Sequence, residues 1–252
     1  MVLNIEYDFT QDTSEYWSGF WDRKGGLGAG GNDPDTSSRT LQEYHRVLWS
    51  RELPCGEKLS LQAGFGSNYL VWRNFRFGSD SIAVSFRYER NRDLLKKVEM
   101  TVPDYHLYVE NFIHKTYTMG GMIIFPKHPN SINQLRGTNS LICDRWDLTL
   151  ECIRRYYAGE ESPLFDVLKK DEDFFQLFVN FRGYVDFFLL QDCVSADYSK
   201  VKIWFGKGDF TEDYPMPKTV EDYLEWIRTQ VQFVEQRNKR IAKLIKRYGL
   251  KL

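Results

Sequence analysis

A long amphipathic segment near the C-terminal end, residues 219–248, constrains the fold more than any other feature of the chain. It opens with Thr219 and has an acid, Asp222, three positions later, which is close to the capping box that begins many helices. Apolar side chains then recur at helical spacing and predict one buried stripe: Val220, Leu224, Ile227, Val231, Val234, Ile241 and Leu244 or Ile245. We therefore predict a single long helix that ends near Tyr248.

The first half of the chain carries strand signals instead. Short segments rich in β-branched and aromatic residues follow one another, bounded by Gly, Asn, Asp and Pro. They are 69–72, 81–88, 97–101, 107–112 and 122–125, and the alternating residues 2–9 predict a further strand. Because turn-length connections separate these segments, they favour an antiparallel sheet or meander over βαβ units.

Helical patterns dominate beyond Pro126. The predicted helices are 139–157, 163–169 and 172–181, after an earlier one at 39–50; residues 183–190 are ambiguous, and 200–205 favour a strand. In the helix 139–157, the spacing of Ile142, Trp146 and Ile153 predicts the face that packs on the sheet. We predict one α+β domain, residues 1–252. Its mostly antiparallel, β-rich N-terminal half is packed by the helices of the C-terminal half.

The hydropathy and the cysteines indicate a cytoplasmic protein. No apolar run approaches the ~18–20 residues that span a bilayer, and the first ten residues lack the basic and apolar regions of a secretory signal. The cysteines have no C-x-x-C spacing, which argues against a zinc site and a disulfide framework. We expect unpaired thiols, a reducing compartment and no membrane partner.

The charges are unevenly distributed along the chain. Residues 236–252 contain seven Lys or Arg and no acid, while the first 235 residues contain 27 basic and 35 acidic side chains. Cations in the last turns of a helix compensate the helix dipole. They also suit contact with nucleic acid or with a protein partner through this basic C-terminal helix.

A glycine-rich segment, residues 25–32, formally contains the G-x-G-x-x-G spacing of dinucleotide-binding loops. That fingerprint requires a strand before it and a helix that opens at it. Here Trp-Asp-Arg-Lys precedes the glycines and Asn-Asp-Pro-Asp follows them. A surface loop is therefore a better interpretation than a phosphate site.

The segment 126–139 is the densest source of ligand-binding groups. It joins a predicted strand to a predicted helix, and a helix N-terminus favours anions. Arg136 would supply a rigid charged fork, so we predict a site for a phosphate, a nucleotide or a nucleic-acid backbone. The predicted substrate-binding residues here are Lys127, His128, Asn133, Arg136 and Asn139. The alternative is a solvated loop whose Asn and Ser side chains make turns.

An acidic row follows on the predicted helix 139–157. Asp144, Asp147 and Glu151 recur at helical spacing opposite the buried face, with Arg155 one turn further on. Such a row could hold Mg²⁺ through water, or it could be a solvated face on which Glu151 and Arg155 pair. We take Asp144 and Glu151 as candidate catalytic carboxylates and Arg155 as a candidate substrate-binding cation.

A candidate general base comes from the helix 39–50. His45 lies there between Tyr44 and Trp49 and is one of four histidines in the chain. Histidine changes charge near neutral pH, which suits acid–base chemistry. The alternative is a satisfied, partly buried histidine with a structural role.

Several long runs resemble an uncharacterised bacterial family, a domain of unknown function. They include GGMIIFP at 120–126, SINQLRGTN at 131–139 and ICDRWDLTLECIRRYYAGE at 142–160. The likeness continues through SPLFDVL at 162–168 and FFQLFVNFRGYVDFFLLQDCV at 174–194, and includes TLQEYHRVLWSRELPCGE at 40–57. The resemblance implies a bacterial or phage origin and a cytoplasmic chain, and it brings no activity, cofactor or catalytic residue with it.

Two functions from different classes follow from these observations. The first is an enzyme, or a toxin-like antiviral defence effector, that acts on a nucleotide or nucleic acid through the loop 127–139, the carboxylates and His45. The second is a non-enzymatic protein-interaction module with an aromatic surface and a basic tail. An enzyme requires Arg136, Asn133 and a carboxylate or His45 to converge in one pocket, whereas a binder requires an exposed aromatic patch.

Overall fold

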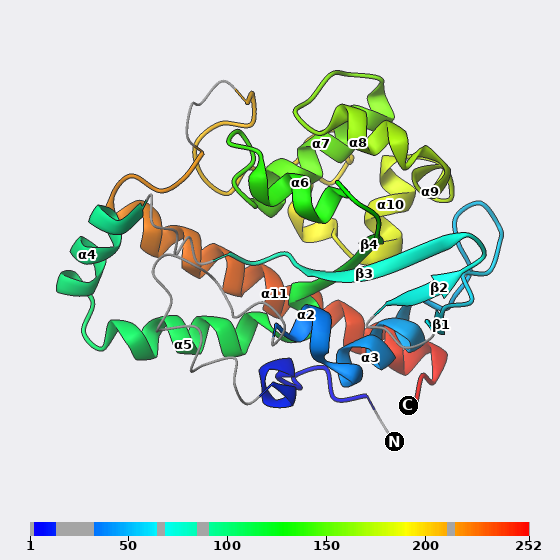
Figure 1. Ribbon diagram of the computed structural model, residues 1–252, viewed down its shortest axis with the longest axis horizontal. Helices are drawn as coiled ribbons and strands as arrows, with labels where there is room; N and C mark the ends of the chain where they lie inside the picture. The colour runs from blue at the N-terminus through cyan, green and yellow to red at the C-terminus, as the bar shows by residue number, and fades with distance from the viewer. Residues whose placement is uncertain (1–2, 14–32, 65–68, 85–90, 211–214, 252) are drawn as a thin grey trace.

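A four-stranded antiparallel sheet forms the centre of the fold (Figure 1). The computed structural model describes residues 3–13, 33–64, 69–84, 91–210 and 215–251. The strands are β1 (Gln62–Ala63), β2 (Leu70–Trp72), β3 (Phe75–Ser81) and β4 (Met122–Pro126), and they pair in that order. In the longest ladder, between β3 and β4, Ser79 lies opposite Ile124 and Asp80 opposite Ile123.

Helices surround this sheet and confirm the predicted α+β class, with a long C-terminal helix. In the first half of the chain they are η1 (Phe9–Asp12), α2 (Pro34–Ser37), α3 (Arg39–Trp49), α4 (Arg92–Thr101), α5 (Tyr105–Thr116) and η3 (Met119–Gly121). After β4 they are α6 (Ile132–Thr138), α7 (Trp146–Ala158), α8 (Phe165–Lys170), α9 (Glu172–Gln176), α10 (Phe181–Phe188), η4 (Gln191–Cys193) and α11 (Val220–Tyr248).

The long helix α11 begins with the predicted capping box. The Thr219 hydroxyl accepts a hydrogen bond from the Asp222 backbone N–H, and the Asp222 carboxylate accepts one from the backbone N–H of Thr219. Five residues of the predicted stripe are buried, as expected: Ile227, Val234, Ile241, Leu244 and Ile245. Val220, Leu224 and Val231 are only half-buried, because the buried face is centred instead on residues such as Trp226 and Phe233.

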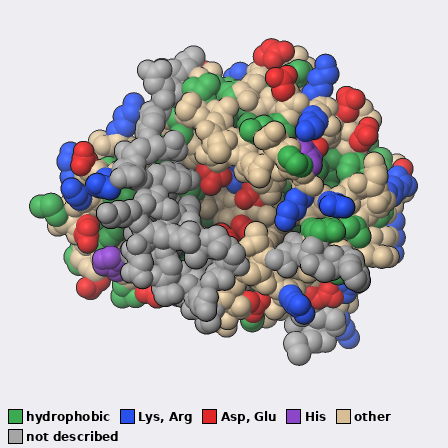
Figure 2. All heavy atoms as spheres, viewed as in Figure 1, with side chains coloured by type: hydrophobic (Ala, Val, Ile, Leu, Met, Phe, Trp, Pro, Cys, Tyr) green, Lys and Arg blue, Asp and Glu red, His purple; other side chains and the backbone are tan. Residues whose placement is uncertain are grey.

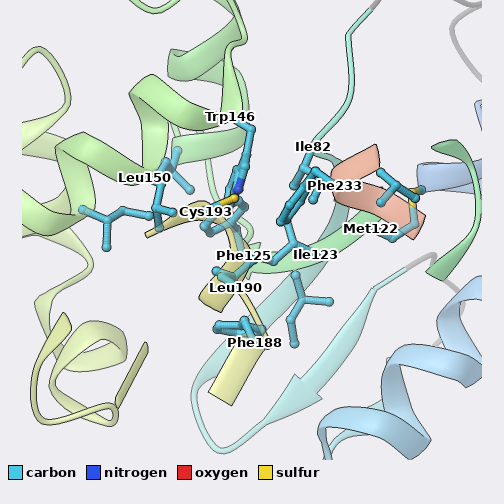
Figure 3. Close-up of a cluster of buried hydrophobic side chains, with 14 of the residues drawn as sticks. Ile82, Met122, Ile123, Phe125, Trp146, Leu150, Phe188, Leu190, Cys193 and Phe233 are labelled. Atoms are coloured by element: carbon cyan, nitrogen blue, oxygen red, sulfur yellow. The ribbon is translucent and has the colours of Figure 1, made fainter. Parts of the chain in front are cut away.

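The hydrophobic core lies where β4 meets the helices of the second half. Every residue of β4 is buried. Figure 3 shows Trp146 and Leu150 of α7 reaching towards Phe125 of β4 and towards Cys193, and the rings of Trp146 and Phe125 are 6.3 Å apart. Ile142, Trp146 and Ile153 are all fully buried, as predicted. Ile142 precedes α7, however, and every residue from Trp146 to Ile153 is buried, so this part of the helix is enclosed on all sides and does not present one buried face.

The first half of the chain contains more helix than the sequence predicted. The predicted strands 97–101 and 107–112 are wrong, because these residues belong to α4 and α5. Short apolar windows do not distinguish the two periods, and over the full length of α5 the buried residues recur at helical spacing: Tyr105, Val109, Phe112, Ile113 and Thr116. The predicted strand 2–9 is also wrong, since residues 3–9 contain no strand and Phe9 opens η1.

Other boundaries were misplaced. β3 occupies 75–81 rather than 81–88, of which 85–88 lie outside the described residues. The predicted helix 139–157 begins only at Trp146, and α6 occupies part of what was predicted as a loop. Residues 183–190 are largely the helix α10, and the predicted strand 200–205 reduces to one bridge, between Val194 and Val201. The glycine-rich segment 25–32 lies outside the described residues.

Candidate functional site

A cavity of about 830 Å³ opens between α2, β3 and the segment that joins β4 to α6. Three carboxylates line it, Asp33, Asp35 and Asp80, and Figure 2 shows acidic side chains gathered in a hollow near the centre of this face. The opposite wall is the chain from Lys127 to Gln134. The cavity thus places an acidic surface against a wall of amide, imidazole and ammonium groups.

The carboxylates of Asp33 and Asp35 are fixed by the start of α2. Asp33 caps this helix by accepting a hydrogen bond from the Asp35 backbone N–H at 3.0 Å. Asp35 in turn accepts hydrogen bonds from the Ser79 hydroxyl at 3.0 Å and from the Ser81 backbone N–H at 3.1 Å. All of these donors are neutral, so hydrogen bonds hold α2 on β3 without neutralising either acid.

Successive residues of β3 point to opposite faces of the sheet. Ser79 lies towards α3, where its hydroxyl is 2.9 Å from Nε2 of His45, and Asp80 lies towards α6. Trp49 Nε1 donates to His45 Nδ1 at 3.0 Å, so the neutral ring carries its proton on Nε2 and donates to Ser79. A directed chain of hydrogen bonds therefore runs from Trp49 through His45 and Ser79 to Asp35.

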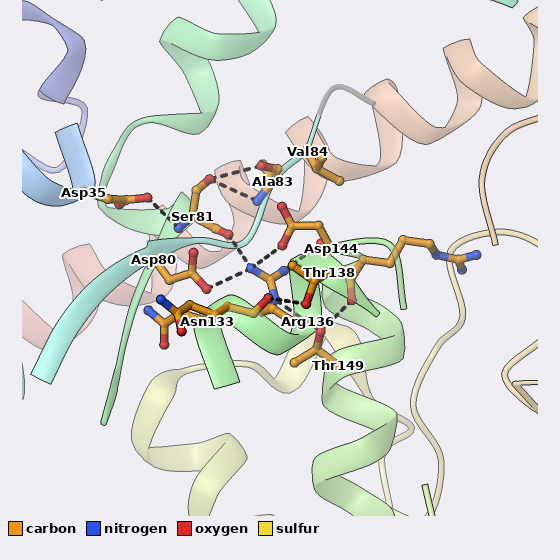
Figure 4. A network of polar contacts seen from close by, with 12 residues as sticks. Asp35, Asp80, Ser81, Ala83, Val84, Asn133, Arg136, Thr138, Asp144 and Thr149 are labelled. Carbon is orange, nitrogen blue, oxygen red and sulfur yellow. Dashed lines mark hydrogen bonds and ion pairs between the residues drawn. The ribbon is translucent and has the colours of Figure 1, made fainter. Parts of the chain in front are cut away.

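Arg136 is fully buried behind the acidic surface (Figure 4). Its guanidinium is 2.9 Å from Asp80 Oδ2 and 2.9 Å from Asp144 Oδ1. It also donates to the backbone carbonyls of Ser81 and Asp144 and to the Thr149 hydroxyl. The guanidinium is thus occupied by the protein itself, and it positions Asp80 and Asp144 instead of presenting a clamp to a ligand.

The turn between α6 and α7 gives Asp144 its place. Cys143 and Asp144 both adopt left-handed backbone conformations, with φ of 49° and 63°. Such conformations are unfavourable for side chains other than glycine. Here the turn brings both the carbonyl and the carboxylate of Asp144 to Arg136. Residues 139–145 are consequently not helical, and the predicted acidic row does not form.

Burial, with a smaller contribution from their mutual charges, raises the pKa values of these carboxylates. The pKa of Asp80 is raised to about 7. Burial is the main cause, the charges of Asp144 and Asp33 raise the pKa as well, and the Arg136 guanidinium opposes them. Burial, followed by the charges of Asp33 and Asp80, raises the pKa of Asp35 well above its usual range. Burial also raises the pKa of Asp33. Desolvation and like charges favour the neutral acid, so Asp80 gains and loses its proton near neutral pH.

Three of the predicted substrate-binding residues, Lys127, His128 and Asn133, line the cavity. His128 Nε2 is 2.8 Å from Asp171 Oδ1, and its Nδ1 is 2.9 Å from the Pro129 carbonyl. Asn133 Nδ2 is 3.4 Å from the Ser79 carbonyl, and its buried Oδ1 accepts no hydrogen bond from a described residue.

The remaining candidate residues do not line the cavity. His45 is buried, which lowers its pKa to about 3 with a contribution from Arg237. Its ring contacts Ser79 and is not exposed in the cavity. Asn139 makes a turn with the Leu141 backbone N–H and contacts the Pro163 carbonyl. Glu151 accepts hydrogen bonds from Arg154 and Arg155 on α7.

The other member of the acidic row is a core residue. Asp147 is fully buried in an ion pair with Arg145, at 2.5 Å, and it accepts a hydrogen bond from the Trp204 backbone N–H. In the described part of the chain no group of three or more His, Cys, Asp or Glu side chains could hold a metal ion. The three acids of the predicted row are therefore separated: Asp147 pairs with Arg145 in the core, Glu151 pairs with Arg154 and Arg155 along α7, and Asp144 pairs with Arg136.

Asp33, Asp35 and Asp80 were not singled out as site residues from the sequence. Asp33 and Asp35 are residue types that commonly cap helices, which gave no reason to expect a site. Asp80 lies in β3, and the strand predicted in this region began only at residue 81. One usable signal was the run Gly78-Ser79-Asp80-Ser81, since small and polar residues inside a strand often mark close approach of another chain segment or a ligand.

Two expectations on the chain as a whole can be compared with the structure. The cysteines form no disulfide in the described part of the chain, as predicted. None of the described helices is both long and apolar enough to cross a membrane.

Comparison with known proteins identifies the family of the chain. Neither the curated proteins nor the solved structures give a match. One family model, described as a family of unknown function (DUF6994), matches residues 3–241. This match spans both the cavity and most of α11, and it confirms the resemblance to an uncharacterised domain. The chain therefore belongs to the family of unknown function DUF6994.

Proposed function

We propose that this protein is an enzyme that acts on a nucleotide or a nucleic acid bound in the 830 Å³ cavity. The observation that carries the proposal is Asp80, a carboxyl with a pKa of about 7 beside Asp33 and Asp35 in a cavity with a cationic rim. A general acid or base works best when its pKa lies near the working pH. Clusters of perturbed carboxyls in a cavity are typical of active sites.

The proposed ligand lies across the cavity. Lys127 and Arg76 are exposed at its edge and would hold the phosphate, away from the carboxylates. Tyr69, whose ring lies 5.2 Å from the Arg76 guanidinium carbon, offers a flat surface for a base. The reacting hydroxyl or amine would then face Asp80, which accepts or donates the proton, while Asp35 orients the ligand.

Arg136 and His45 act as positioning residues in this proposal. Arg136 holds Asp80 in place and keeps its pKa from rising further. His45 fixes the Ser79 hydroxyl that donates to Asp35. Mg²⁺ is a compatible cofactor, since it usually binds through one or two carboxylates together with ligand phosphates. A role in antiviral defence or as a toxin stays a prediction.

Ligand binding and turnover test the proposal separately. Nucleoside mono-, di- and triphosphates, with and without Mg²⁺, are titrated by calorimetry, and products are followed by chromatography. We expect at least one nucleotide to bind. Lys127→Gln should weaken this binding about tenfold through loss of a charge-assisted contact. Asp80→Asn should bind the nucleotide but form no product. Lys169→Gln, an exposed lysine on α8, is the matched control. Equal binding by the two lysine variants would contradict the proposed ligand orientation.

An apolar groove favours protein interaction as a second candidate function. It encloses about 630 Å³ between the α4–α5 corner and α11, lined by residues such as Val102, Tyr108, Phe112 and Val231. Met100 and Leu107, at the same corner, are 87% and 54% exposed. If this groove pairs two copies of the chain, sedimentation should show a dimer that Leu107→Asp dissociates without lowering the melting temperature. A monomer at all concentrations removes this candidate.

A further inference from the structure

The C-terminal turns of α11 carry a concentrated positive charge. Lys239, Lys243, Lys246 and Arg247, here called the basic face, are all exposed. None of the four forms an ion pair with a described residue, whereas their neighbour Arg240 pairs with Asp192 at 2.5 Å. The segment 236–252 contains no acid that could neutralise them. The basic face is therefore a net positive surface and not half of a salt-bridge network.

Compensation of the helix dipole does not account for this surface. That effect is confined to about the last turn of a helix. α11 ends at Tyr248, so Lys246 and Arg247 fall within its last turn, while Lys239 lies more than two turns earlier. Lys239, Lys243 and Arg247 follow one another at steps of four residues, which is about 6 Å along a helix. The result is a row of cations along one side of the helix.

This row lines a groove of about 340 Å³. The groove is bounded by Lys239, Arg240, Lys243 and Arg247, with Leu189 and Leu244 as its apolar walls. Tyr248 follows directly and is 55% exposed, and the Arg247 guanidinium carbon is 5.4 Å from the centre of its ring. An exposed aromatic ring beside a positively charged groove is the combination that binds single-stranded nucleic acid. An acidic protein would be attracted by the cations alone.

We propose that the basic face and Tyr248 bind single-stranded nucleic acid, with the cations on successive phosphates and the ring stacked on a base. This inference goes beyond the proposed function and does not rest on it, because no residue of the basic face lines the 830 Å³ cavity. In Figure 1 the C-terminal end of α11 lies towards the lower right, away from α6.

The test measures binding of the full chain to a fluorescent 16-nucleotide oligo-dT by anisotropy at several salt concentrations. In one variant Lys239, Lys243, Lys246 and Arg247 are changed to Gln. The matched control changes four exposed lysines elsewhere to Gln, namely Lys96, Lys97, Lys169 and Lys218. For a single strand, log K falls with log salt by about 0.7 per phosphate contacted. We expect the first variant to reduce this slope by about 3, and the control to leave it unchanged.

Tyr248 distinguishes a nucleic acid from any other polyanion. We expect Tyr248→Ala to weaken oligo-dT binding roughly 5- to 150-fold with the salt slope unchanged. We expect Tyr248→Phe to bind as wild type, and neither variant to alter binding of polyglutamate. An equal reduction of the salt slope in the lysine control would overturn the proposal. Unchanged oligo-dT affinity of Tyr248→Ala would also overturn it, in favour of an acidic protein partner. Asp80→Asn should bind oligo-dT as wild type, because Asp80 lines the cavity and not the basic face. Failure of the cavity proposal would therefore not affect the expected binding of oligo-dT to the basic face.

Discussion

Two groups of carboxylates in this protein differ in what neutralises them. On α7, Asp147 pairs with Arg145, and Glu151 is held between Arg154 and Arg155. Around the cavity, Asp33 and Asp35 accept hydrogen bonds from hydroxyl and backbone N–H groups, and no described cation pairs with either. A carboxylate beside an arginine stabilises the fold as an anion. Carboxylates that are crowded together without a neighbouring arginine either bind protons or can bind a cationic or hydrogen-bonding ligand.

Asp80 belongs to both groups, because it pairs with Arg136 and still has a pKa of about 7. One arginine serves both Asp80 and Asp144, so its single positive charge does not neutralise two acids. The ratio of guanidinium to carboxylate groups thus separates the acids paired within the fold from the cavity acids with raised pKa values.

Asp147→Ala should be the most destabilising change. It leaves the Arg145 guanidinium buried without its carboxylate, and loss of one partner of a buried pair costs about 3–5 kcal/mol. Chemical denaturation followed by fluorescence measures the free energy of unfolding. Nucleotide binding by the remaining folded protein should be unchanged. A loss below about 1 kcal/mol would mean that Asp147 is not the core residue described here.

Arg136→Met should also destabilise the protein, by roughly 3 kcal/mol, because the guanidinium has no exposure to solvent and holds two acids. Unlike Asp147→Ala, it should raise the pKa of Asp80 above about 7, since Arg136 lowers that pKa. NMR titration of the side-chain carboxyl carbons measures this shift. An unchanged pKa for Asp80 would separate the arginine from the acidic cluster.

Asp80→Asn should change how stability depends on pH. An unfolded Asp loses its proton near pH 3.9, whereas Asp80 in the folded protein loses it at about 7. Between these values the folded state holds a proton that the unfolded chain lacks, so the stability of the wild type falls as pH rises through this window. The variant should lack this fall, which is on the order of 2–4 kcal/mol. Denaturation curves at pH 4, 6 and 8 measure it, and parallel curves for the two proteins would refute the assignment.

Glu151→Gln should have the smallest effect. Glu151 is only 8% exposed, but its two arginine partners are partly exposed to solvent. We therefore expect a loss on the order of 1–2 kcal/mol, between that of an exposed pair and that of a buried one. Denaturation at low and high salt measures the loss, which should shrink as salt screens the pairs. A loss of unfolding free energy as large as that of Asp147→Ala would mean that Glu151, like Asp147, is essential to the core.

Local patterns in the sequence determined several elements of this protein. The capping box at Thr219, the long helix after it and the strand ending near Phe125 follow from signals within a few residues of one another. The burial of Trp146 and Ile153 follows likewise from their spacing, although burial of Asp147 and Glu151 on the same helix does not. These features depend on backbone propensity and on periodic apolar side chains, which the sequence displays directly.

Tertiary structure alone decided which polar residues come together around the cavity. Asp33, Asp80 and Asp144 lie more than forty residues apart from one another in the sequence, and pairing of β3 with β4 and packing of α2 on β3 bring them together. Arg136 had every attribute of an exposed anion clamp, yet the turn after α6 folds it inwards onto Asp80 and Asp144. Whether a charged side chain serves the fold or a ligand depends on its burial and on the charges around it, and these arise only when distant segments pack.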